Sequence, residues 1–118
     1  MGSRTWIKVY CDNWINGSLR AESAGLRSIW IDLLALTGTT SFADIGELKL
    51  ANKVGYTDDQ IAGVLSLDVE LWIRAKNRLI ETERITVDKY NVIKILNWAK
   101  YQSEYQRQKK YRKDENQS

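Results

Sequence analysis

The clearest periodicity in the chain lies between residues 26 and 37. Apolar side chains recur there with the three- and four-residue spacing of one helical face, at Leu26, Ile29, Trp30, Leu33, Leu34 and Thr37. Because an α-helix has 3.6 residues per turn, this spacing predicts a core helix of about four turns. Ser18 or Ser23 is placed to cap its start, and Gly38 is placed to end it.

Two further helices are predicted between residues 57 and 81. Thr57 and Gln60 have the spacing of a capping box, ahead of a short apolar face over residues 61–65. Residues 66–68 then end this helix and cap the next one. The second helix has an apolar stripe at Val69, Trp72, Ile73, Lys76, Leu79 and Ile80. Its opposite face carries Glu70, Arg74, Asn77, Arg78 and Glu81.

Two β-branched runs follow the helix pair. Residues 84–87 and 91–96 flank a short polar link at residues 88–90, which predicts a β-hairpin. Residues 45–50 alternate in polarity, so they form either a short strand or a first helical turn. Residues 6–10 form either a short strand or an apolar anchor that packs on the body.

The predicted order of elements is helix, possible strand, short helix, longer helix, hairpin and tail. This is the order of a winged helix-turn-helix, in which the second helix of the pair enters the DNA major groove and the hairpin forms the wing. We therefore expect a mainly α domain with a small β-hairpin over residues 4–98. Residues 99–118 are expected to be a basic tail or a linker towards a missing C-terminal domain.

The net charge of +3 is distributed unevenly. Residues 98–118 hold six basic and three acidic residues; subtracting them from the 18 basic and 15 acidic residues of the whole chain leaves twelve of each sign in residues 1–97. A basic arm on a neutral body favours contact with a polyanion. The candidate phosphate contacts are Lys100, Arg107, Lys109, Lys110, Arg112 and Lys113. The alternative is a solvated chain end.

The polar face of the second helix offers candidate base readers. Arg74, Asn77 and Arg78 point the same way; Arg can read guanine bidentately and Asn can read adenine. Lys76 adds to this cluster. The alternative is a solvated face on which glutamates pair with the arginines. At the hairpin tip, Lys89 and Tyr90 are candidates for a phosphate or groove contact.

Composition excludes much of the common catalytic repertoire. The chain has no histidine and a single cysteine, Cys11, so neither a Cys/His zinc site nor a His-based triad can form. No glycine-rich phosphate loop is present. We expect no enzyme activity, no metal and no cofactor. The absence of a long apolar run and of a signal peptide predicts a cytoplasmic protein rather than a membrane protein. A bacterial host cell and an association with its nucleoid are implied only by the family resemblance given below.

Several short motifs, taken in order, resemble the N-terminal domain of phage replisome organisers, which are related to the DnaD-type primosome proteins. They are residues 6–10, 30–34, 55–57, 97–102 and 105–107 with the basic run, within a resemblance that covers nearly all of residues 4–113. The resemblance implies a winged helix that binds the replication origin, followed by a domain that engages a helicase loader or helicase. One departure is the junction at residues 80–85, where relatives often place a glycine.

Three functional hypotheses follow. The first is sequence-specific binding of double-stranded DNA at a phage or plasmid replication origin. The second is a transcription regulator with the same fold. The third is a primosome interaction module, in which the wing and residues 6–14 mediate a homo-oligomer and the tail is a tether. Of the five tryptophans, we expect Trp30 and Trp72 in the core and Trp98 closing the fold.

Overall fold

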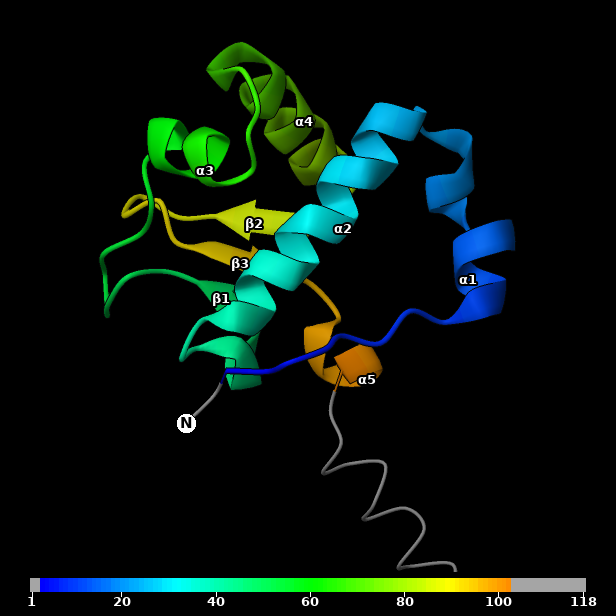
Figure 1. Ribbon diagram of the computed structural model, residues 1–118, viewed down its shortest axis with the longest axis horizontal. Helices are drawn as coiled ribbons and strands as arrows, with labels where there is room; N and C mark the ends of the chain where they lie inside the picture. Colours follow the sequence, from blue (N-terminus) through cyan, green and yellow to red (C-terminus); the bar gives the residue numbers. More distant parts are fainter. Residues whose placement is uncertain (1–2, 103–118) are drawn as a thin grey trace, which may run out of the picture.

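The computed structural model describes residues 3–102, and the structural statements below concern that range. The chain is mainly helical, with a small three-stranded antiparallel sheet (Figure 1). The mainly helical class and the hairpin predicted from the sequence are confirmed. The basic tail from residue 103 onward lies outside the described residues.

The predicted core helix is α2, Ala24–Thr39. The Ser23 hydroxyl caps its start by accepting a hydrogen bond from the Leu26 amide at 3.1 Å. The prediction that Gly38 ends this helix is wrong, because Gly38 lies inside it and Thr40 is the C-cap. The N-terminal segment instead packs against α2 at Gly38. The Gly38 carbonyl accepts a hydrogen bond from the Arg4 amide at 2.6 Å, and a Cβ at Gly38 would press on the Ile7 side chain.

The two helices that follow are α3, Asp58–Val64, and α4, Val69–Glu81. The predicted capping box is confirmed, since Thr57 and Gln60 exchange side-chain-to-backbone hydrogen bonds of 3.1 and 2.8 Å. Ser66 adopts a left-handed φ of 57° at the end of α3, and the Leu67 amide donates to Ala62 at 2.8 Å. This arrangement is a Schellman motif, which turns the chain sharply into α4.

The sheet consists of β1, Glu47–Leu48, β2, Ile85–Val87, and β3, Ile93–Ile95, in the order β1-β3-β2. Residues 45–50 therefore contain a short strand rather than a first helical turn that runs into Ala51. Thr86 and Lys94 are cross-strand partners on the exposed face. The opposite face is buried and carries Leu48, Ile85, Ile93 and Ile95.

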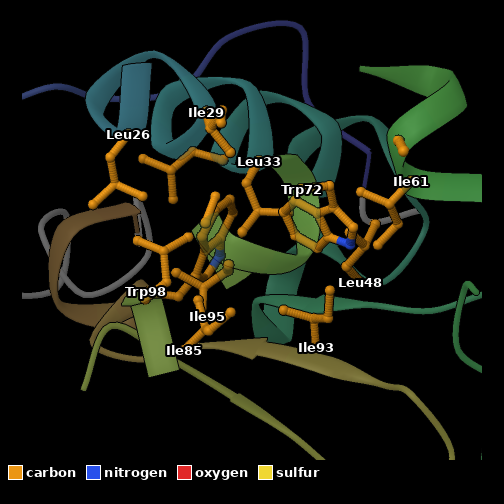
Figure 2. Close-up of a cluster of buried hydrophobic side chains, with 14 of the residues drawn as sticks. Leu26, Ile29, Leu33, Leu48, Ile61, Trp72, Ile85, Ile93, Ile95 and Trp98 are labelled. Atoms are coloured by element: carbon orange, nitrogen blue, oxygen red, sulfur yellow. The ribbon is translucent and has the colours of Figure 1, made fainter. Parts of the chain in front are cut away.

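One hydrophobic core joins this buried face to the helices. Figure 2 shows side chains from α2, Trp72 from α4 and the isoleucines of β2 and β3 meeting in one cluster. Trp72 is fully buried and Trp30 packs half-buried at the edge. Trp98 closes the core from α5, Trp98–Gln102, as the sequence predicted. Gly46 permits this contact, because its φ is +66° and a Cβ would overlap the indole.

The N-terminal arm, residues 3–10, runs along the body without forming a strand. The strand reading of residues 6–10 is therefore wrong, and the anchor reading holds for Ile7, which packs against the core. Three short elements of the structure have no periodicity that could have predicted them, and two of them directly follow the arm. They are α1, Cys11–Asn16, the 3-10 helix η1, Ser18–Ala21, and, beyond α2, the 3-10 helix η2, Ala43–Ile45.

The junction between α4 and β2 contains a residue in the left-handed region. Glu83 adopts a φ of 59° there. Its amide donates to Ile80 at 3.0 Å, and the Arg84 amide donates to Leu79 at 2.9 Å, which again completes a Schellman motif. A glutamate therefore serves here where a glycine would be unstrained, and the helix stops in time for the hairpin to turn back onto the core.

Candidate nucleic-acid interface

The outward face of α4 presents Arg74 and Asn77, both exposed. Neither side chain has a hydrogen bond or ion pair with another residue in the 3–102 range. They lie three positions apart and hence on one side of the helix. Two of the four predicted α4 contacts thus remain open to a ligand.

Lys76 faces the neighbouring helix. Its ammonium group lies 2.8 Å from an Asp58 carboxylate oxygen, and the Trp72 indole donates to the same oxygen at 2.9 Å. Burial raises the pKa of Asp58, but the hydrogen bonds from Lys76 and Trp72 outweigh it, so the pKa lies below its ordinary value. The lysine and the buried indole together fasten α4 to the first turn of α3.

Arg78 spans from α4 to the start of α2. Its guanidinium donates to the Glu22 carboxylate at 2.8 and 3.1 Å, and it lies 3.4 Å from Glu81. The hydrogen bond from Arg78 lowers the pKa of Glu22, and the same bond raises the pKa of Arg78. The ion pair with Glu81 is the one expected of a solvated helix face, while the pair with Glu22 joins two elements distant in sequence.

The tip of the β2–β3 hairpin is held by Asp88. Its carboxylate accepts hydrogen bonds from the amides of Tyr90 at 2.8 Å and Val92 at 3.1 Å. Asn91 completes the turn with a left-handed φ of 64°, a conformation that asparagine tolerates better than most residues. Lys89 and Tyr90 are therefore presented outward on a fixed turn.

A second loop, residues 49–56, packs against this tip. The Gly55 amide donates to the Tyr90 carbonyl at 2.9 Å, and a Cβ on Gly55 would overlap the backbone of Asn91. The ammonium groups of Lys53 and Lys89 consequently lie 6.0 and 5.2 Å from the centroid of the Tyr90 ring. We call Lys53, Lys89 and Tyr90 the hairpin-tip cluster.

Lys53 is the functional candidate that the sequence reasoning missed. It belongs to a loop more than thirty positions before the hairpin, so spacing alone could not join the two. Gly55, part of the Gly55-Tyr56-Thr57 motif, was the available signal, because a glycine can mark a close backbone approach. The backbone at Lys53 has a left-handed φ of 61°, which projects this residue from a tight turn.

The remaining predicted contacts belong to the tail. Lys100 lies exposed on α5 with its ammonium group 5.3 Å from the centroid of Tyr101. The other predicted tail contacts, Arg107, Lys109, Lys110, Arg112 and Lys113, are outside the described residues. The helix α5 crosses the predicted domain boundary at residue 98, and that boundary remains a prediction.

The part of the chain that the structure describes contains no group of three potential metal ligands. None of its helices has the length and apolar character needed to cross a bilayer. A groove of about 400 Å³ lies between the arm with α1 and the body. Its walls include the rings of Tyr10, Trp14, Trp30, Trp98 and Tyr101.

Comparison of the sequence with protein families gives a match to the N-terminal phage replisome organiser family over residues 6–118. The chain belongs to this family. Comparison with curated proteins and with solved structures gives no match. The replisome organiser family indicates a role in phage replication. In this replisome organiser domain, Arg74 on α4 and the two lysines of the hairpin-tip cluster have no carboxylate partner within residues 3–102.

Proposed function

We propose that this replisome organiser domain is a winged helix that binds double-stranded DNA, with sequence preference, at a phage or plasmid replication origin. The observation that carries the proposal is the hairpin-tip cluster, which lies at the turn of the β-hairpin that follows the α3–α4 pair along the chain. Two lysines on two loops that pack together suit phosphate contact, and the second helix of a pair suits the major groove. The element order and the strand order support the winged-helix assignment.

The α4 candidates divide into two groups under this proposal. Arg74 and Asn77 read base edges, since both are exposed and of the types that bond guanine and adenine bidentately. Lys76 and Arg78 hold α4 against α3 and α2 through Asp58 and Glu22. The second pair therefore acts by positioning the reading face.

The tail and the partners complete the proposal. The cations of residues 100–113 add sequence-independent phosphate contacts. A domain beyond this one engages the helicase loader or helicase. The domain itself works without catalysis or a cofactor.

A second function is favoured by a separate observation. The arm and α1 expose Trp6, Val9 and Ile15, with 45–56% of each residue accessible. Exposed apolar side chains on one segment are typical of a protein-protein contact. The alternative is an interaction module that self-associates through this segment, as a primosome component.

The test is fluorescence anisotropy of the full chain with the candidate origin duplex and a scrambled duplex. We expect tighter, salt-sensitive binding to the origin. Substituting Arg74→Ala and Asn77→Ala should remove the preference, at a cost of about 1–3 kcal/mol on the origin alone. Glu70→Ala on the same helix is the matched control. Equal affinity of the wild type for both duplexes would refute sequence reading, and light scattering would show whether the chain instead self-associates.

A further inference from the structure

The N-terminal arm and α5 lie side by side and form a surface of which the duplex proposal uses only Lys100 (Figure 1). Gln102, which is buried, fixes them together. Its side-chain carbonyl accepts from the Lys8 amide at 2.7 Å, and its side-chain amide donates to the Lys8 carbonyl at 2.8 Å. The Arg4 guanidinium also donates to Gln102, at the side-chain oxygen and at the backbone carbonyl.

Aromatic rings and cations alternate along this surface. Trp6 is 56% exposed, and the charged groups of Arg4 and Lys8 lie 5.7 and 6.0 Å from its ring centroid. Tyr10 is 45% exposed and meets Tyr101 edge-on at 5.4 Å. We call these residues, with Lys100 beside Tyr101, the arm strip: Arg4, Trp6, Lys8, Tyr10, Lys100 and Tyr101.

The charge of the arm strip has one sign. Residues 3–10 and 98–102 contain three cationic residues and no aspartate or glutamate. Lysine is depleted where protein surfaces dock on one another, whereas cations interleaved with exposed rings are typical of surfaces that follow a nucleic acid backbone. The pattern therefore favours a polyanion with flat apolar groups over an apolar protein face.

The strip also continues into the groove between the arm and the body. Tyr10 and Tyr101 line both, and Trp14, Trp30 and Trp98 extend the aromatic wall inward. In a duplex the faces of the bases are covered by neighbouring bases, so the exposed rings of the protein cannot stack on them. In a single strand the faces are free to stack on tryptophan and tyrosine.

We propose that the arm strip is a binding site for single-stranded nucleic acid. Bases stack on Trp6 and Tyr10 and reach the mouth of the aromatic groove, while Arg4 and Lys100 attract the phosphates. The site is separate from α4 and the hairpin-tip cluster and does not depend on the duplex proposal. A domain with both sites could hold a duplex and one strand released from it.

The test is anisotropy of a labelled oligo-dT of about 16 nucleotides with the full chain and its Trp6 variants. Trp6→Ala should weaken binding at least about 5-fold, since one stacked base contributes that much or more. Trp6→Phe should restore most of the affinity, because it keeps a ring. Trp6→Leu should not, because it keeps only apolar area. Ile15→Ala, an equally exposed apolar residue outside the strip, should bind as the wild type does.

Three results would overturn the proposal. One is wild-type oligo-dT affinity in Trp6→Ala, which would assign single-strand binding to the tail. Another is full affinity in Trp6→Leu, which would exclude stacking. The third is a loss of self-association in Trp6→Ala and Ile15→Ala with unchanged oligo-dT affinity, which would assign the surface to a second copy. Arg74→Ala with Asn77→Ala should leave oligo-dT binding intact, so the failures of the two proposals are distinguishable.

Discussion

Two basic clusters of this domain have similar composition and different surroundings. On α4, the charged groups of Lys76 and Arg78 each lie 2.8 Å from a carboxylate oxygen contributed by another part of the chain. At the hairpin tip, Lys53 and Lys89 lie beside the ring of Tyr90, and within residues 3–102 neither forms an ion pair. Lys76 and Arg78 are therefore committed to the fold, whereas Lys53 and Lys89 are not.

The comparison shows why the number of cations on a helix does not predict how strongly that helix binds phosphate. A lysine paired with a carboxylate contributes little net field at a distance, and using it to bind phosphate requires the pair to separate. A lysine on an aromatic ring keeps its whole charge available to a phosphate. Four substitutions test how these two regions are held in the fold, from the largest expected effect to the smallest.

The largest effect is expected from Gly55→Ala, which separates the 49–56 loop from the hairpin tip. The new Cβ would overlap the backbone of Asn91, which cannot move aside as a side chain can. We expect a loss of about 3 kcal/mol in the free energy of unfolding, measured by urea denaturation. Gly63→Ala is the control, because a Cβ there meets open space. Equal midpoints for the two variants would contradict the proposed packing.

Asp58→Ala removes the carboxylate that binds Trp72 and Lys76 of α4. It leaves the fully buried indole of Trp72 without its acceptor, and we expect a loss of about 2 kcal/mol by thermal or urea unfolding. The ion pair between Lys76 and Asp58 adds little to this loss of stability, because the Asp58 side chain is 38% exposed. Asp59→Ala, one position along the same first turn, should cost well under half as much. A similar loss in both variants would show that only the helix dipole matters.

Glu83→Gly tests the junction between α4 and β2, which connects the helix to the hairpin. A non-glycine residue in the left-handed region costs about 1 kcal/mol, so the glycine should raise the free energy of unfolding by about that amount. Glu81→Gly, two positions earlier and inside α4, should lower it by about 1 kcal/mol. Opposite signs for the two variants support the Schellman assignment, and a loss in both would refute it.

The smallest effect concerns pH. Hydrogen bonding to Arg78 lowers the pKa of Glu22, so this pair contributes stability above the ordinary glutamate pKa of about 4.3 and loses it as pH falls through the lowered pKa. We expect the free energy of unfolding to fall less steeply between pH 5 and about pH 3 in Glu22→Gln than in the wild type. Identical pH profiles would show that the pair is not maintained in solution.

The sequence predicted those features that depend on neighbours within one turn or one hairpin. The α2 stripe, the Thr57–Gln60 capping box and the hairpin about residues 88–90 all have local signals and are confirmed. Gly38 misled the prediction of a helix end, because its small size serves a contact with the arm instead. The elements α1 and η1, which follow the arm, have no clear periodicity, so the sequence pattern did not predict them.

The candidate site depended more on long-range contacts. The partners of Lys76 and Arg78 lie 18 and 56 positions away, so their carboxylates could not be assigned from spacing. The contact of Lys53 with Tyr90 was also not predictable from sequence spacing, because it forms only where two loops pack together. Exposure of Arg74 and Asn77, by contrast, follows from the helical period and was predictable.

The salt dependence of duplex binding tests the central claim most directly. Anisotropy titrations over a range of salt concentrations would compare the full chain, a Lys53→Ala/Lys89→Ala variant and a Lys76→Ala variant. If the tip lysines contact phosphates and Lys76 holds the fold, the double variant should reduce the slope of log affinity against log salt by about 2, and Lys76→Ala should leave it unchanged. An unchanged slope in the double variant, or a reduced slope in Lys76→Ala, would contradict this division between binding and structural cations.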